Sequence, residues 1–128
     1  IAMSMAGHEA KHYETAARVA ADLVQRHTRT ALKPPILLNV NVPDVPYDQL
    51  AGYEITRLGK RHKAEPVVKA TNPRGETVFW IGAAGAVADA GPGTDFHATE
   101  NRRVSITPLQ VDLTNYQQMK YAAEWVGT

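Results

Sequence analysis

The most constraining feature of this 128-residue sequence is a helix pattern that lies between two β-rich runs in its first 45 residues. Residues 1–5 are short and apolar and are followed by Gly7, which is typical of a buried strand that ends in a turn. From His12 to His27 the apolar positions recur every three or four residues, which predicts an amphipathic helix. Ile36–Val42 has little alternation at its start, so we expect a central strand covered on both faces. Strand, helix and strand in this order predict a right-handed βαβ unit and a parallel sheet.

A β-rich part follows Pro43. Tyr53–Leu58 alternates with period two, which predicts a half-exposed strand. Asn72–Gly75 has turn chemistry and separates two further β-rich runs, so we predict a hairpin over residues 65–81, with at least one of its large rings exposed. The remaining expectations are a loose Gly/Ala-rich loop over residues 82–93, a strand over Val104–Pro108 closed by its proline, and a last helix with Thr114 as its N-cap.

One helix and two strands do not cover both faces of a parallel sheet. The chain also begins at Ile1 without an initiator methionine, in what reads as a strand already in progress. We therefore expect the missing strands to come from sequence upstream of Ile1.

Composition narrows the possible partners. There are 14 basic and 13 acidic side chains, so we expect no bulk attraction to a nucleic-acid polymer or an anionic membrane. No apolar stretch approaches the roughly 20 residues of a membrane span, and we see no secretory leader. The chain has no cysteine, which excludes disulfides and Cys-based zinc sites and is compatible with the cytoplasmic location that we expect.

Histidines offer two candidate sites, each with a plainer alternative. His8 and His12 are four residues apart with Glu9 between them, which superficially resembles a two-histidine zinc site. However, we expect the helix to begin after His8 and find no third ligand, so solvated histidines near a helix start are the alternative. His62 lies in the basic cluster Lys60–Lys63, which is either a phosphate site or a solvated loop.

The segment Asp89–His97 is the most informative for function. Its glycines let backbone approach a ligand closely, and Thr94 and Asp95 offer a hydroxyl and a carboxylate at a helix start. The alternative is a capped helix after a flexible loop. The sequence contains no nucleophile elbow, P-loop or dinucleotide fingerprint, and no complete set of acid, base and nucleophile.

Five ordered motifs together resemble the carboxyl-terminal half of the SurE family, the stationary-phase survival proteins. They are Leu38–Asp44, Ile55–Gly59, Asn72–Gly75 with Trp80–Gly82, Asp89–Phe96 and Val104–Thr114. The opening Ile1–Ser4 and the following helix fit as well, so the resemblance covers nearly the whole chain.

The resemblance implies a metal-dependent phosphatase that hydrolyses nucleoside monophosphates, a 5′/3′-nucleotidase. It implies an α/β fold, with residues 1–45 as the end of a Rossmann-like domain and residues 46–128 as a β-rich part for oligomerisation. It further implies a homodimer or homotetramer formed through hairpin 66–82 and helix 114–126.

The sequence departs from the family at its metal centre. SurE proteins bind the metal with adjacent aspartates, a serine and an asparagine of the amino-terminal half, and this sequence has no Asp-Asp pair. We therefore expect a divalent ion of the magnesium or manganese type with its ligands outside this chain, and we assign no catalytic or metal residue to these 128 positions. Thr94 and Asp95 are the candidates for lining the approach to the substrate. The alternative is a non-catalytic oligomerisation module that is inactive as an isolated fragment.

Overall fold

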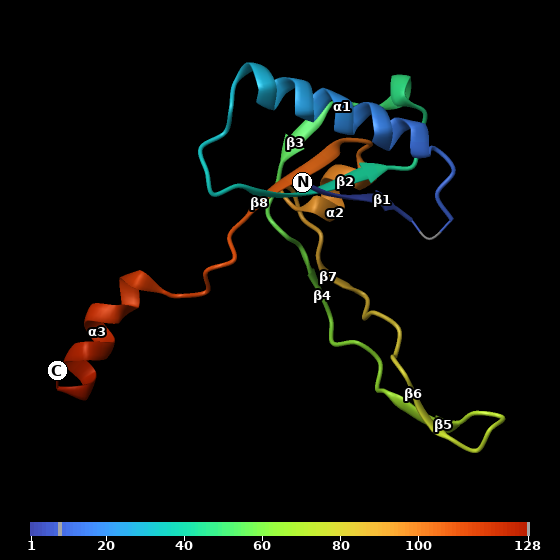
Figure 1. The fold of residues 1–128 in the computed structure, drawn as a ribbon, viewed down its shortest axis with the longest axis vertical. Helices are drawn as coiled ribbons and strands as arrows, with labels where there is room; N and C mark the ends of the chain where they lie inside the picture. Colours follow the sequence, from blue (N-terminus) through green and yellow to red (C-terminus); the bar gives the residue numbers. More distant parts are fainter. Residues whose placement is uncertain (8, 128) are drawn as a thin grey trace.

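A parallel βαβ unit opens the structure, a computed structural model that describes residues 1–7 and 9–127 (Figure 1). Strand β1 (Ala2–Ala6) pairs in parallel with β2 (Leu37–Pro43), and helix α1 (Tyr13–Arg29) connects them. The predicted unit is confirmed. Its helix forms because small and apolar residues recur at helical spacing, and Val19 and Leu23 from this stripe are buried against the sheet.

The sheet has four strands in the order β1-β2-β8-β3. Strand β8 (Val104–Leu109) runs antiparallel to β2 and parallel to β3 (Tyr53–Ile55), so the sheet is mixed. The prediction of a parallel sheet is therefore wrong for the pairing of β2 with β8. Two of its strands, β1 and β2, come before residue 45 and two, β8 and β3, come after it. The predicted division into residues 1–45 and 46–128 stays a prediction.

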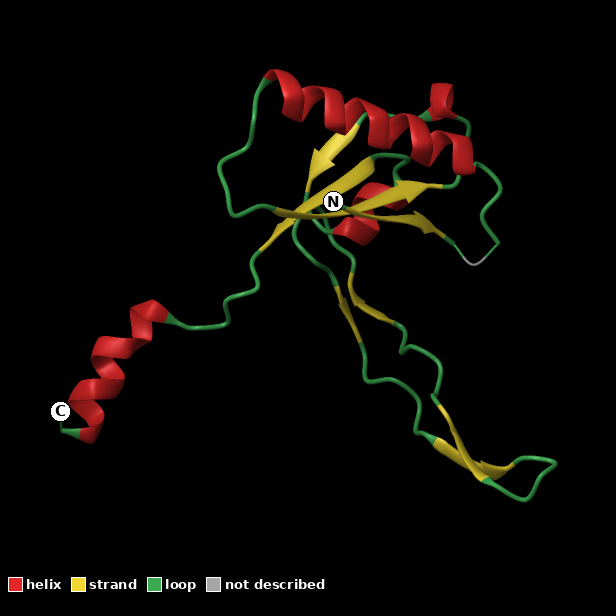
Figure 2. Cartoon of the chain, in the orientation of Figure 1, coloured by secondary structure: helices red, strands yellow, loops and turns green. Residues whose placement is uncertain are grey.

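Each face of the sheet carries its own kind of side chain. Alternate residues of β2 and β8 pack against α1 and form the apolar core with Val19 and Leu23: Leu38, Val40, Val42, Val104 and Ile106. The intervening positions are polar and face the short helix α2 (Asp95–Glu100), which lies on the other side of the sheet from α1 (Figure 2). The expected coverage of β2 on both faces is confirmed.

Residues 59–92 form a long arm that leaves the body of the molecule after β3 (Figure 1). Its outer end is the predicted hairpin, made by β5 (Val68–Thr71) and β6 (Thr77–Trp80). Its inner end is a pair of short antiparallel strands, β4 (Lys60–Arg61) and β7 (Val87–Asp89). The prediction of a loose loop over residues 82–93 is therefore wrong for β7. Gly82 and Gly85 help to explain why the two segments of the arm lie so close together. A Cβ at either position would lie within 2.2 Å of a backbone oxygen of the opposite segment.

Two strand ends also differ from the predictions. The expected strand over Tyr53–Leu58 stops at Ile55, where the chain turns toward the arm. Pro108 lies within β8 and pairs with Leu38 instead of closing the strand. Strand β3 pairs with β8 only as far as Ile106, so β8 has no neighbour on that side at Pro108. A proline, which has no N–H to donate, is tolerated at such an edge position.

The chain leaves β8 as an extended tail that ends in helix α3 (Tyr116–Val126), well away from the sheet (Figure 1). The N-cap is Asn115, whose side-chain oxygen accepts a hydrogen bond from the Gln118 N–H at 3.2 Å. The prediction of Thr114 as the cap is therefore wrong, since the Thr114 N–H donates to Asp112 in the preceding turn. No residue of α3 is buried.

Candidate functional site

Thr94 is the N-cap of helix α2, at the base of the arm. Its buried hydroxyl accepts a hydrogen bond from the His97 N–H at 3.1 Å and donates to the Gly91 carbonyl at 2.8 Å. The predicted cap is confirmed. Both contacts lie within the loop and helix, so this hydroxyl fixes local structure.

Asp95 joins helix α2 to the start of the arm. One oxygen of its carboxylate accepts hydrogen bonds from the Gly59 N–H at 2.7 Å and from the Phe96 N–H at 3.0 Å. Gly59 has no room for a larger residue, because a Cβ there would lie 2.3 Å from a Phe96 ring carbon and 2.6 Å from the Asp89 carbonyl oxygen. The close approach is thus at Gly59 and not at the predicted glycines of Asp89–His97, since a Cβ at Gly91 would meet nothing nearer than 3.9 Å and one at Gly93 nothing within 4 Å. The approach of backbone to a ligand at those two glycines stays a prediction.

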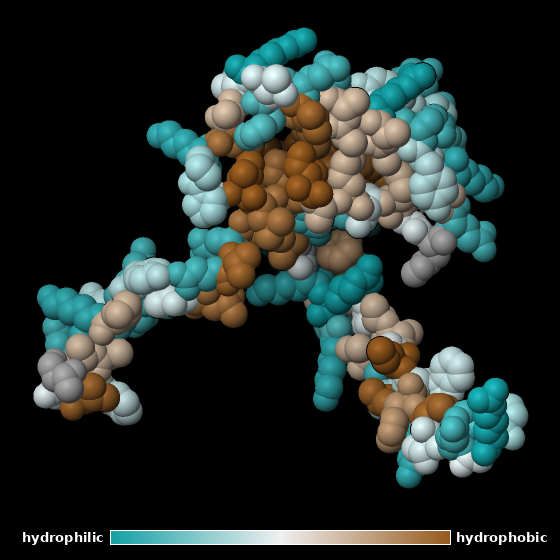
Figure 3. All heavy atoms as spheres, viewed as in Figure 1, coloured by the Kyte–Doolittle hydropathy of each residue, from teal (hydrophilic) through white to brown (hydrophobic). Residues whose placement is uncertain are grey.

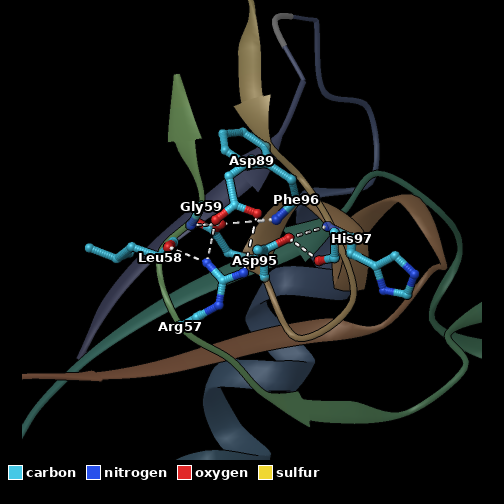
Figure 4. Close-up of polar contacts among 9 residues, drawn as sticks. Arg57, Leu58, Gly59, Asp89, Asp95, Phe96 and His97 are labelled. Carbon is cyan, nitrogen blue, oxygen red and sulfur yellow. Dashed lines mark hydrogen bonds and ion pairs between the residues drawn. The ribbon is translucent and has the colours of Figure 1, made fainter. Parts of the chain in front are cut away.

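An ion pair closes the same junction from the other side. The Arg57 guanidinium donates to both carboxylate oxygens of Asp89, at 2.5 and 3.2 Å. This hydrogen bonding lowers the pKa of the Asp89 carboxyl and raises the pKa of Arg57. Figure 4 shows Arg57, Gly59, Asp89 and Asp95 close together where the outgoing and returning segments of the arm meet the body.

Sequence patterns do not predict that Arg57, Gly59 and Asp89 form one cluster. Arg57 and Asp89 are 32 residues apart, so no local pattern links them. Gly59 carried the one available signal, a glycine directly after a β-rich run, which often marks close backbone approach. Thr94 and Asp95 do come together, but the structure places them beside the carboxyl end of β3, at the opposite edge of the sheet from the carboxyl ends of β1 and β2. Their role toward a substrate stays a prediction.

The basic cluster Lys60–Lys63 lies on the inner part of the arm and is exposed. The Arg61 guanidinium stacks over the Phe96 ring, 4.9 Å from its centre, and also donates to the Gly85 carbonyl. The His62 N–H donates to the Ala86 carbonyl. These contacts give Arg61 a structural function at the arm base and leave the phosphate interpretation of the cluster without a buried donor.

A histidine and a carboxylate meet at the other edge of the sheet, where β1 and β2 both end. Asp44 directly follows β2, and one of its oxygens lies 3.0 Å from Nδ1 of His12. The same carboxylate accepts hydrogen bonds from the backbone N–H groups of His12 and Lys11, which lower its pKa. The zinc hypothesis for His8 and His12 is not tested, because His8 lies outside the described residues.

An apolar hollow of about 680 Å³ lies between the second half of α1 and the end of the sheet where β1 and β2 begin. Figure 3 shows it as a brown area in the body of the molecule. Its apolar lining comes from the first residue, from α1 and the segment after it, and from the strands: Ile1, Leu23, Val24, Leu32, Ile36, Leu38, Ile55, Ile106 and Pro108. Its polar lining comes from the end of α1 and the residue after it: Arg26, His27, Thr28, Arg29 and Thr30.

Side chains that bind metals do not gather in the described part of the chain. No three His, Asp or Glu side chains within residues 1–7 and 9–127 lie close enough together to hold an ion. These residues therefore do not fit a complete metal site of their own, and ligands for a divalent ion outside this chain stay a prediction.

Comparison with known proteins places this fold. A family model described as survival protein SurE matches residues 1–65, half of the chain. The chain belongs to the SurE family. This confirms the resemblance read from the ordered motifs.

Similar proteins extend the match beyond residue 65. The chain is 59% identical to a 5′-nucleotidase SurE of Methylobacillus flagellatus and 60% identical to one of Nitrosomonas europaea, each over 126 residues. Each match covers 98% of this chain and 51% of the relative, so the chain spans about half the length of the curated relatives it matches.

A solved structure gives the same fold. The crystal structure of SurE protein from Aquifex aeolicus is similar with a TM-score of 0.74 and 38% sequence identity, covering 97% of this chain and 50% of that one. The α/β architecture is thereby supported by an experimental structure. None of the helices in the described part of the chain has the length and apolar character needed to cross a membrane.

Proposed function

We propose that this chain is the carboxyl-terminal half of a cytoplasmic enzyme that hydrolyses nucleoside monophosphates with the help of a divalent ion of the magnesium or manganese type. The observation that carries the proposal is about 60% identity, over nearly the whole chain, to proteins named 5′-nucleotidase. A divalent ion with oxygen ligands would polarise the phosphate and activate water. In this proposal those ligands lie outside the 128 residues.

The chain's own contribution is mainly a scaffold for that site. Its βαβ unit provides two parallel strands, and in open α/β sheets ligands bind outside the carboxyl ends of such strands. Thr94 and Asp95 lie at the opposite end of the sheet, and their described hydrogen bonds are within the protein. Their proposed contribution to a substrate approach is therefore indirect: they fix the base of the arm.

Activity measurements on two proteins test the proposal. We expect the full-length protein to release phosphate from AMP with Mn²⁺ and the purified 128-residue chain to release none. The matched control is the full-length protein with EDTA, which should lose its activity. Phosphate release by the isolated chain, or no release by the full-length protein with any nucleoside monophosphate, would contradict the proposal.

A second candidate function is assembly, and the exposed aromatic residues of the arm and the tail favour it. Phe79 and Trp80 of the hairpin are 65% and 66% exposed, and Trp125 of α3 is 87% exposed. Figure 3 shows brown, apolar atoms in the outer part of the arm, short of its teal tip, and near the end of the tail. Large rings of this kind are common at the centres of protein interfaces. We propose that hairpin 66–82 and helix 114–126 bind other copies of the chain in a homodimer or homotetramer.

Light scattering coupled to gel filtration tests the assembly proposal. We expect Trp80→Ser in the hairpin and Trp125→Ser in α3 each to lower the mass of the assembly, because each removes a large apolar contact. Tyr13→Ser is the matched control, since Tyr13 is 65% exposed but lies on α1 in the body. A wild-type chain that elutes as a monomer at all concentrations would contradict the proposal.

A further inference from the structure

The inference concerns His12 and Asp44, at the edge of the sheet where β1 and β2 end. Nδ1 of His12 lies 3.0 Å from an Asp44 carboxylate oxygen, and both side chains are partly open to solvent, at 32% and 25%. The pair is therefore neither buried in the core nor a freely moving surface contact.

Asp44 is held in one position by the chain around it. Its carboxylate accepts the Lys11 N–H at 2.9 Å and the His12 N–H at 2.8 Å in addition to the imidazole. Close by, the Thr15 hydroxyl donates to the Val45 carbonyl at 2.8 Å, which fixes the first turn of α1 against the segment after β2. The imidazole ring is thus oriented by a fixed carboxylate.

That orientation leaves the second ring nitrogen available. A carboxylate at Nδ1 accepts the N–H of that nitrogen, so Nε2 is the atom that exchanges a proton with another molecule. No described residue bonds to Nε2. A histidine whose first nitrogen is held by a carboxylate and whose second is free is a recurrent arrangement of catalytic acids and bases.

The location of the pair favours a catalytic use. His12 follows β1 and Asp44 follows β2, so both lie outside the carboxyl ends of two adjacent parallel strands. Ligands of open α/β sheets bind at that edge. The cluster at the arm base, by contrast, lies at the opposite edge, and its Arg57, Asp89 and Asp95 side chains form hydrogen bonds within the protein.

We propose that His12 is the proton donor to the leaving group in phosphate ester hydrolysis and that Asp44 is its positioning residue; the inference rests on the proposed nucleotidase function. The oxygen of water forms a new bond to phosphorus while the bond from phosphorus to the nucleoside oxygen breaks. The proton on Nε2 of the doubly protonated imidazole passes to the departing nucleoside oxygen, which leaves as an alcohol. The proton of the attacking water goes to solvent, from which the imidazole is reprotonated.

The test compares a poor and a good leaving group in the full-length enzyme. Asn at position 12 places an amide nitrogen where Nδ1 lies, so His12→Asn retains the hydrogen bond to Asp44 but has nothing at the position of Nε2. We expect His12→Asn to lower kcat for AMP by about 100-fold or more, the usual contribution of a general acid. We expect hydrolysis of p-nitrophenyl phosphate to change by less than about threefold, because nitrophenolate leaves without a proton.

Controls separate this role from a structural one. His27→Gln alters another histidine of the same helix, at its far end, and should leave both substrates unaffected. Asp44→Asn should show the same selective loss for AMP as His12→Asn, to a smaller extent, because it acts through His12. Should His12→Asn fail to fold, His12→Gln is judged by the same comparison.

Each outcome has a definite meaning. A selective loss for AMP supports the inference. Unchanged rates, or equal losses for both substrates, would overturn it and leave the proposed nucleotidase function standing. A wild-type enzyme that hydrolyses neither substrate would overturn the proposed function itself, and the inference with it.

Discussion

At the scale of single residues, Tyr53 shows how one hydroxyl connects helix α1 to β3, the strand that Tyr53 begins. Its hydroxyl donates to an Asp22 carboxylate oxygen at 2.9 Å, and the Tyr47 hydroxyl donates to the same oxygen at 3.2 Å. The rings are covered in turn by arginines of α1, with Arg26 lying 5.3 Å from the Tyr53 ring centre. Burial and the Asp22 acceptor raise the pKa of Tyr53 above its ordinary value of 10.0.

This contact predicts a loss of stability at alkaline pH. The folded state retains the Tyr53 proton at a pH where the unfolded state has lost it, so the contribution is complete below about pH 10 and falls as the pH rises further. Tyr53→Phe should lower the free energy of unfolding by about 1 kcal/mol at neutral pH and flatten this alkaline fall. Urea unfolding at a series of pH values measures both effects.

Tyr121→Phe is the control for that series, because Tyr121 lies on the outside of α3 and is 62% exposed. It should leave the alkaline fall unchanged. An equally steep fall in the Tyr53→Phe protein would show that other groups cause it.

At the scale of elements, several side-chain contacts hold the base of the arm, a junction between the arm and the body. Arg57 and Asp89 form an ion pair between the outgoing and returning segments, Asp95 accepts a hydrogen bond from the Gly59 N–H, and Arg61 stacks on Phe96. Nearby, the buried Thr56 hydroxyl lies 2.8 Å from the Ser105 hydroxyl and 2.7 Å from the Thr107 hydroxyl, which fixes the end of β3 to β8. The direction in which the arm leaves the body therefore follows from side-chain contacts on both sides of its first residue.

Gly59→Ala is expected to disrupt this junction. The added methyl group would lie 2.3 Å from a Phe96 ring carbon and 2.6 Å from the Asp89 carbonyl oxygen, so one of these groups must shift. We expect a loss of about 1–3 kcal/mol, the usual cost of overpacking, together with faster proteolysis within residues 59–92.

Gly91→Ala is the matched control in the same region. Its Cβ would have Asp89 as the nearest neighbour at 3.9 Å, which is ordinary contact. The control should unfold within about 0.5 kcal/mol of wild type. If Gly59→Ala resists urea and protease as well as Gly91→Ala does, the junction is not rigid.

Acid should loosen the same junction. The pKa of Asp89 is lowered, so its pairing with Arg57 is fully present above the ordinary carboxyl pKa and is lost as the pH falls through the lowered value.

Periodicity explains which elements were predictable from the sequence. The stripe of α1 and the β-rich residues of β2, β5 and β6 carry strong local signals, and all four form. Strand β7 carries no such local signal, because its three residues pair only where the opposite segment of the arm comes close.

The candidate sites were less predictable for a related reason. The contacts of His12 with Asp44 and of Arg57 with Asp89 each join residues 32 positions apart, and only the fold brings them together.

At the scale of the whole molecule, the chain consists of a body with two projections (Figure 2). The body buries a small core between α1 and one face of the sheet. The arm and the tail leave from the carboxyl ends of β3 and β8, strands that run antiparallel to β1 and β2, so both projections start at the edge opposite His12 and Asp44. This separation is consistent with proposing assembly at one edge of the sheet and chemistry at the other.

We propose that this chain contributes the scaffold, the assembly surfaces and the proton donor His12, while the ligands of the divalent ion lie outside it. Calorimetric titration of Mn²⁺ into the purified 128-residue chain and into the full-length protein tests the location of those ligands. We predict one bound ion per full-length protomer and no specific binding by the isolated chain. Stoichiometric binding of Mn²⁺ by the isolated chain would contradict the claim.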